Sequence, residues 1–298
     1  MAGVKGGPTE TDAGGRGAVA ASTDGARPNA APTLEYARFT REAPYKRADP
    51  DAPNEDASLC LELDAETTVL AVADGVGGQA HGEQASALAI ECLREGLERA
   101  DADPANLREP ILDAIERCNR ELLADGRGSA TTIAVVERYG DTMRPYHVGD
   151  SSILVVGGRG RVRFRSINHS PIGYGIEAGL LDESAATEHE ERHWLSNIVG
   201  SDEMRIEIGA PLALAARDTL LLCSDALTDN LTLEAISDAA RRRPLARAVE
   251  LLESACEAAM GGANGHPDDL TLVLHRRLAR GVRRAGGSGR ARSSSGDD

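Results

Sequence analysis

The chain has 298 residues, a net charge of −15 and a hydrophobic fraction of 41%, a composition that suits a soluble globular protein with a substantial core. The negative charge argues against a nucleic-acid binder that works by broad electrostatic attraction, and no apolar run approaches the ~20 residues of a membrane-spanning helix. Five widely spaced cysteines without a CxxC pair argue against a disulfide framework or a structural zinc site. They indicate buried free thiols in the reducing cytoplasm.

Both ends of the chain have the composition of disordered tails. Residues 1–33 are rich in Gly, Ala, Pro, Ser and Thr and lack the apolar stretch of a signal peptide, which argues against export. From Arg276 onward the chain carries seven arginines against two aspartates, so this end is expected to be a basic tail, with contact to an acidic surface as the alternative role. We predict a tail at 1–33, one domain over 34–279 and a disordered basic tail at 280–298.

Strand and helix patterns follow one another in groups along this domain. The predicted ranges are strands at 58–63 and 67–74, helices around 85–96 and 107–122, strands at 129–137, 143–148, 151–156, 161–167, 205–208 and 219–224, helices at 232–241 and 245–260, and a strand at 270–275. Because the helices are grouped and do not alternate with strands, the order favours an α+β layered fold over a Rossmann-type sheet. Two sheets packed together, with helix pairs outside, would accommodate it.

Four of the apolar strands carry an aspartate at one end. These are Asp74, Asp150, Asp225 and Asp268. An ionised carboxylate beside a dry core is costly unless a positive charge neutralises it. One such aspartate is usually a helix cap or a turn former, but four indicate an all-oxygen site that suits Mg²⁺ or Mn²⁺ better than zinc. Periodicity alone leaves open whether the four strand ends converge.

The residues around these aspartates form five motifs in a fixed order. They read Asn54-Glu55-Asp56, Asp74-Gly75-Val76-Gly77-Gly78, Gly149-Asp150-Ser151, Ser224-Asp225-Ala226-Leu227-Thr228-Asp229 and Pro267-Asp268-Asp269-Leu270-Thr271. At this spacing, over about residues 40–276, the set resembles the metal-dependent protein phosphatases of the type 2C family. The resemblance implies a four-layer α-β-β-α sandwich, with two central, mostly antiparallel sheets flanked by helix pairs.

The resemblance also implies an activity, the hydrolysis of phosphoserine or phosphothreonine in proteins with two Mn²⁺ or Mg²⁺ ions as cofactors. A water between the two cations would attack phosphorus in line, while the cations offset charge on the phosphoryl oxygens. The expected partners are phosphorylated proteins, substrates of a serine/threonine kinase. A monomer is expected, with no nucleic acid and no membrane span.

Residue by residue, the resemblance implies the following metal ligands. Asp74 would bridge the two ions, and the carbonyl of Gly75 would bind one of them. Asp225 and Asp268 would complete the second site. Asp150 together with Asp225 is the further option for a weaker third ion.

Two other groups are implied beside these ligands. Glu55 and Asp56 would hold metal-bound water. An arginine shortly before Asn54 would grip the substrate's phosphate with two hydrogen bonds. Arg47 is the closest candidate, although six residues with two prolines separate it from Asn54. Arg41 is the alternative, and a solvent-exposed Arg47 without this role is also left open.

The sequence departs from the family pattern at several positions. Ala226 stands where a glycine is usual, and its Cβ would cost on the order of 1 kcal/mol if the position needs a positive φ. Val76 stands where some relatives have a histidine that protonates the leaving alcohol, and His81 is expected at a surface helix start. Asp269 replaces a frequent asparagine and would either tighten metal binding or lie in solvent. Asn168 replaces an aspartate, which we interpret as a loop variation.

Two rival functions stay open at this level. A pseudophosphatase or regulatory module of the same fold would bind phosphoproteins without turnover, with Ala226 as its main support and intact Asp74, Asp225 and Asp268 against it. A structural adaptor acting through the tails would leave the five motifs as coincidence. Release of phosphate from a phosphothreonine peptide with Mn²⁺, abolished by EDTA, separates the three functions.

Overall fold

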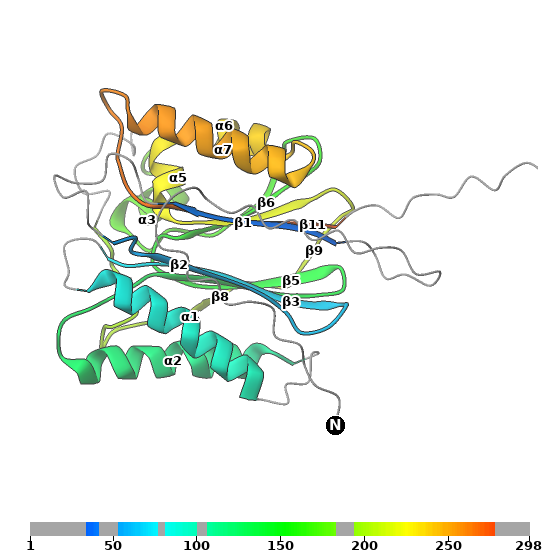
Figure 1. The fold of residues 1–298 in the computed structure, drawn as a ribbon. Helices are drawn as coiled ribbons and strands as arrows, with labels where there is room; N and C mark the ends of the chain where they lie inside the picture. Colours follow the sequence, from blue (N-terminus) through cyan, green and yellow to red (C-terminus); the bar gives the residue numbers. More distant parts are fainter. Residues whose placement is uncertain (1–33, 42–52, 77–80, 100–105, 183–193, 278–298) are drawn as a thin grey trace, which may run out of the picture.

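Two β-sheets packed face to face form the centre of the molecule, and helices cover the outer face of each (Figure 1). The computed structural model describes residues 34–41, 53–76, 81–99, 106–182 and 194–277. The layers follow the order α-β-β-α, so the prediction of a four-layer sandwich with antiparallel sheets is confirmed.

The first sheet contains both the first and the last strand of the described chain, β1 and β11. Its strands pair antiparallel in the order β1-β11-β10-β6-β7. Two helices, α6 and α7, pack on its outer face and bury an apolar cluster there. The bounds are β1 (Leu34–Arg41), β6 (Ser152–Val156), β7 (Val162–Arg165), β10 (Thr219–Cys223), β11 (Leu270–Arg277), α6 (Leu233–Ala240) and α7 (Leu245–Met260).

The second sheet has the order β2-β3-β4-β5-β8, with β9 also pairing with β5. Helices α1 and α2 cover its outer face. The bounds are β2 (Asp56–Glu62), β3 (Thr67–Asp74), β4 (Ile133–Tyr139), β5 (Thr142–Val148), β8 (Glu207–Ile208), β9 (Leu212–Ala213), α1 (Gly82–Arg99) and α2 (Arg108–Asp125). Two short helices complete the described elements, α3 (Pro171–Glu177) and α5 (Asp225–Asn230).

The middle strands are buried on both faces, which explains their nearly continuous apolar runs. Along β3, Val69 and Ala71 face the helices, whereas Leu70 and Val72 face the other sheet. This alternation follows from the two-residue period of a strand. Each strand therefore joins an outer core to the inner core, and its end is held firmly in place.

Most predicted elements exist, and the strand at 67–74 and the helix at 245–260 have the predicted bounds. Others differ at their ends, and β1, β9, α3 and α5 were not predicted. The elements β9, α3 and α5 carry too few residues for a period to show in the sequence. The predicted tails at 1–33 and 280–298 lie outside the described residues.

The closing strand is longer than predicted and includes Arg276. Its side chain is 1% exposed, and its guanidinium donates to Thr219 Oγ1 at 3.0 Å and to the carbonyl oxygens of Arg242 at 2.7 Å and Ala240 at 2.6 Å. A buried guanidinium with such partners belongs to the folded domain. Arg276 therefore belongs to the folded domain, inside the predicted range 34–279, and not to the basic end of the chain with which its charge was counted.

All five cysteines lie in the described part of the chain as free thiols, four of them buried and Cys60 half-buried. The prediction of free thiols is confirmed. Among the described residues, no helix combines the length and the apolar character needed to cross a membrane.

Candidate metal centre

Asp56 and Asp74 lie directly opposite each other where β2 and β3 pair. The Cβ atoms of such a pair are about 4.5–5.5 Å apart, and like charges at that distance repel. Both carboxylate oxygens of Asp56 are buried and form no hydrogen bond of normal geometry, although the side chains of Thr271 and Ser224 lie near enough to lower its pKa. Buried, opposed carboxylates are an arrangement that a cation between them would stabilise.

The other predicted aspartates lie close to this pair. Asp225 begins α5 directly after β10, Asp150 lies between β5 and β6, and Asp268 lies two residues before β11. Burial raises the pKa of Asp74 well above its ordinary value, and the charges of the four other aspartates, Asp56, Asp225, Asp268 and Asp150, raise it further. The structure therefore brings together strand ends that are far apart in the sequence.

The same repulsion acts on the remaining members of the cluster. Burial first, and then Asp269 and Asp268, raise the pKa of Asp56 to about 8. Burial and then Asp229 and Asp268 raise the pKa of Asp150 to about 7. Without a cation, these side chains hold protons near neutral pH that ordinary carboxylates have already lost.

Asp229 also belongs to this cluster, although no role was predicted for it from the sequence. It raises the pKa values of both Asp150 and Asp225. Asp225 and Asp229 are four residues apart in α5, which places them on one face of the helix. The four-residue spacing could have identified Asp229 as a neighbour of Asp225, but only if this segment had been predicted to be helical.

Hydrogen bonds to two threonines hold the backbone of Asp74. Its N–H donates to Thr132 Oγ1 at 3.2 Å, and its carbonyl accepts from the Thr132 N–H and from Thr131 Oγ1, both at 2.8 Å. Thr132 Oγ1 also lies 2.6 Å from Ser151 Oγ, next to Asp150. One threonine thus links the strand ends that carry two aspartates of the cluster.

Gly75 is required because another part of the backbone comes very close. A Cβ added to Gly75 would lie 2.4 Å from the carbonyl of Gly82, and a Cβ on Gly82 would lie 3.0 Å from Glu55 Oε1. The N–H of Gly75 donates to the carbonyl of Glu55 at 2.9 Å. The start of α1 therefore lies against Gly75, where a side chain would clash with the backbone of Gly82.

Asn230 fixes the loop that carries Asp268 relative to the helix that carries Asp225. Its Nδ2 donates to the carbonyl of His266 at 2.7 Å and to that of Ala226 at 2.9 Å, and its Oδ1 accepts from the His266 N–H at 2.9 Å. These bonds connect the end of α5 with the segment before β11.

Asp269 does not lie in solvent, which was one of its two expected positions. It is 2% exposed, and its Oδ2 accepts a hydrogen bond from the N–H of Glu55 at 2.8 Å. This bond joins the start of β2 in one sheet to the start of β11 in the other.

Ala226 does not have the positive φ that would strain an alanine. Among the described residues, only His81 and Arg217 combine a side chain with a positive φ. Ala226 lies in α5, is buried and packs in the outer core beneath α7. The expected cost of its Cβ does not arise, so this residue gives no support to an inactive relative.

The predicted phosphate-binding residue, Arg47, lies outside the described residues. Its alternative, Arg41, forms ion pairs with Glu253, at 2.9 Å, and with Glu257, both on α7. His81 lies exposed at the start of α1, as predicted.

His169 is buried beside this cluster, a position that the interpretation of Asn168 as a loop variation did not predict. Its Nδ1 accepts from the N–H of Gly149 at 3.1 Å, and its Nε2 lies 3.1 Å from Glu207 Oε2. Because Nδ1 accepts, the proton of the neutral ring is on Nε2 and is donated to the carboxylate. His169 thus connects the residue before Asp150 with β8.

His147, His169 and Glu207 could also be considered as a second metal site, since one ligand atom of each lies within 4.8 Å of the others. The rings of the two histidines stack at 4.3 Å. To bind a cation through Nε2, His169 would lose the proton that it donates while Nδ1 still accepts from Gly149. A histidine ligand normally donates through its other nitrogen, so the hydrogen bonds favour a structural role here.

Comparison with known proteins finds relatives over most of the domain. The family model described as protein phosphatase 2C matches residues 45–259. Serine/threonine protein phosphatase PstP of Mycobacterium tuberculosis is 28% identical over 230 residues, which are 75% of this chain and 42% of PstP. Protein phosphatase PhpP of Streptococcus pneumoniae is 29% identical over 215 residues, which are 70% of this chain and 85% of PhpP. The chain thus spans less than half the length of PstP.

Solved structures share the fold. The serine/threonine phosphatase of S. agalactiae superposes with a TM-score of 0.70 at 25% identity, over 82% of this chain and 99% of that one. The catalytic domain of PstP in complex with two manganese ions gives a TM-score of 0.65 at 24% identity, over 83% of this chain and 99% of that one.

The raised pKa values predict how the stability of the metal-free protein depends on pH. Asp56 and Asp150 keep protons up to about pH 8 and about pH 7 when folded, but lose them near 3.8 when unfolded. The folded state then binds more protons, so the free energy of unfolding falls as pH rises. The buried His147 and His275 have lowered pKa values, so they bind fewer protons when folded than when unfolded near pH 6.5 and oppose this trend there; above about pH 7.5 they are neutral in both states. With EDTA, the melting temperature should therefore fall from about pH 7.5 to about pH 8.5, and Mn²⁺ should reverse the fall.

Asp56→Asn should raise the melting temperature of the metal-free protein at about pH 8, because it removes one buried charge. The matched control is Asp113→Asn on α2. The carboxylate of Asp113 is exposed, so this variant should have the same melting temperature as the wild type at each pH. A melting temperature that rises over this pH range would contradict the prediction.

Loss of His169 should destabilise the turn that carries Asp150. His169→Leu leaves the buried N–H of Gly149 without an acceptor, which should cost about 1–3 kcal/mol in urea unfolding and weaken Mn²⁺ binding in titration calorimetry. His169→Asn, with an oxygen near the position of Nδ1, should lose less. Glu207→Gln is the control, because its half-exposed side chain remains able to accept the ring's hydrogen bond. Equal stability of His169→Leu and the wild type would show that the bond is unimportant.

Proposed function

Since the chain belongs to the protein phosphatase 2C family, we propose that it removes phosphate from phosphoserine and phosphothreonine in proteins with the help of divalent cations. The family resemblance predicted from the five motifs is confirmed by the match over residues 45–259. PstP and PhpP are named as protein phosphatases, in agreement with the predicted activity. The observation that carries the proposal is the convergence of buried, mutually repelling aspartates at the ends of strands from both sheets.

The residues of the cluster fit hard divalent cations. All donors are oxygens, as Mg²⁺ and Mn²⁺ prefer. Both carboxylate oxygens of Asp56 and the Oδ1 of Asp225 are buried and form no hydrogen bond of normal geometry with the described residues. We assign two ions to the cluster, with Asp74 between them and a weaker third at Asp150. The proposed ligands are Asp56, Asp74, the carbonyl of Gly75, Asp150, Asp225 and Asp268, with Asp229 added from the structure.

Two such cations, when bound, lower the pKa of a water between them and offset the charge of the phosphoryl oxygens. The chain's own contribution is to hold the carboxylates in position before the substrate arrives. The hydrogen bonds of Asp74 to Thr131 and Thr132, and of Asn230 to the loop before Asp268, provide that preorganisation. Such preorganised electrostatics avoid reorganisation at the moment of reaction.

Catalysis is favoured over a pseudophosphatase role. The alanine that supported the inactive alternative is unstrained, and Asp74, Asp225 and Asp268 are present in the cluster. We further propose Arg47 as the phosphate contact. We also propose that the protein acts as a monomer in the cytoplasm, where its thiols stay reduced, on substrates of a serine/threonine kinase.

The function is tested with a phosphothreonine peptide and Mn²⁺. Phosphate release should require Mn²⁺ or Mg²⁺ and stop with EDTA. Asp74→Asn should lower turnover by orders of magnitude, because it removes the charge between the two proposed ions. Asp113→Asn, which changes an exposed carboxylate, serves as the control. Near-normal turnover by Asp74→Asn at saturating Mn²⁺ would rule out the proposed site.

The phosphate contact is tested by two arginine variants. Arg47→Ala should raise KM by roughly ten- to a hundred-fold and leave kcat nearly unchanged, because a charge-assisted hydrogen bond contributes about 1.5–3 kcal/mol to substrate and transition state alike. Arg41→Ala should leave KM unchanged, since Arg41 pairs with glutamates of α7. A raised KM in Arg41→Ala, with Arg47→Ala unaffected, would move the contact to Arg41.

A further inference from the structure

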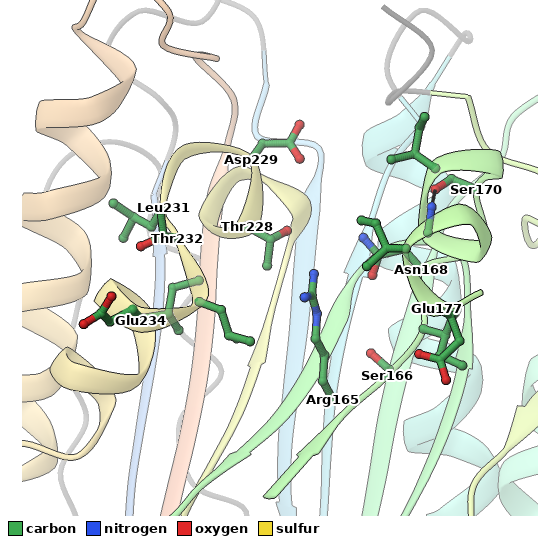
Figure 2. Close-up of a pocket in the computed structure, with 16 residues that line it drawn as sticks. Arg165, Ser166, Asn168, Ser170, Glu177, Thr228, Asp229, Leu231, Thr232 and Glu234 are labelled. Atoms are coloured by element: carbon green, nitrogen blue, oxygen red, sulfur yellow. Dashed lines mark hydrogen bonds between the residues drawn. The ribbon is translucent and has the colours of Figure 1, made fainter. Parts of the chain in front are cut away.

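A cavity of about 540 Å³ lies between α3 and the segment from α5 to α6 (Figure 2). Its volume is in the range of ordinary ligand pockets. Six aliphatic side chains line it: Ile167, Ile172, Ile176, Leu231, Leu233 and Ile236. Ile176, Leu231 and Leu233 are only half-buried, so apolar surface is accessible from the cavity.

The cavity shares residues with the candidate metal centre. Asp229, in its wall, lies four residues after Asp225 in α5 and therefore on the same face of that helix. Thr228, beside it, donates from Oγ1 to the carbonyl of Asp225 at 3.1 Å. On the opposite wall, Asn168 Oδ1 accepts from Ser152 Oγ at 3.3 Å. A substrate whose phosphate lies at the metal centre would therefore have its neighbouring residues next to this cavity.

Charged groups surround the apolar walls. Arg165 extends from β7 into the gap between Thr228 and Asn168, as Figure 2 shows. Glu177 and Glu234 are exposed on opposite walls of the cavity, on α3 and α6. These carboxylates would repel an acidic side chain between α3 and α6, although Arg165 would attract one at its own end of the cavity. An aliphatic side chain could bury itself against the six apolar residues without losing a polar contact.

We infer that this cavity binds an aliphatic side chain of the phosphoprotein substrate, within a few residues of the phosphorylated one, and so selects among substrates. The inference rests on the proposed function of the neighbouring metal centre. An extended chain advances about 3.3–3.6 Å per residue, so the second or third neighbour reaches about 7–10 Å from the phosphorylated residue. A peptide held at the metals can therefore place such a side chain in an adjoining cavity.

The test uses phosphothreonine peptides of alanine background, each with one leucine at one of the three positions on either side of the phosphothreonine. Full-length protein with Mn²⁺ should show a kcat/KM about ten-fold higher for leucine at one of these positions than for alanine. Ile176→Ser and Leu233→Ala should remove most of this preference. Leu180→Ser should keep it, because Leu180 is 80% exposed and does not line the cavity. Turnover of p-nitrophenyl phosphate, which has no flanking residues, should be the same in all variants.

Two outcomes would overturn the inference. If p-nitrophenyl phosphate and the peptides are hydrolysed but no position prefers leucine, the inference is wrong and the proposed function stands. If neither p-nitrophenyl phosphate nor the peptides are hydrolysed, both the inference and the proposed function are wrong. Melting curves establish that the variants fold, and the milder Leu233→Ala decides the test if Ile176→Ser does not fold.

Discussion

Repulsion between Asp56 and Asp74, paired directly across two antiparallel strands, is the constraint on which the rest of this structure depends. Three further aspartates, Asp150, Asp225 and Asp268, raise the pKa of Asp74, so the metal-free site opposes folding near neutral pH. A protein can keep such a group only where the surrounding structure is stable enough to hold it. Divalent cations offset the repulsion, which ties stability and proposed function to the same atoms.

The two-sheet core supplies that stability. Strands such as β3 and β10 are buried on both faces, between an outer helix layer and the inner core. Their ends therefore cannot move apart without opening two cores at once. The bond from the N–H of Glu55 to Asp269 Oδ2 joins the sheets at the site, and the threonine contacts of Asp74 hold its backbone. The cluster is thus built on rigid elements, as a preorganised site requires.

Around the cluster, the contributions of neighbouring residues differ in kind. His169 is bonded to the backbone before Asp150 and to β8, so it positions a carboxylate and stays outside the chemistry. The cavity between α3 and α6 adjoins the cluster through Asp229 and offers apolar surface. The strand ends would then carry out the reaction, and the neighbouring short helices would select the substrate.

The sequence by itself determined the layered α+β fold, the main strands and helices, and the family, because apolar periodicity and five ordered motifs are local signals. It also identified Asp74, Asp150, Asp225 and Asp268 as aspartates at strand ends. Only the tertiary structure decided that these ends converge, since strand register and sheet packing depend on partners far along the chain. The same reason applies to Asp229, whose role depends on a six-residue helix, and to Ala226, whose φ no residue type reveals. Arg276 shows the limit most directly: its charge suggested a tail, but its partners across the sheet and at the end of α6 bury it in the domain.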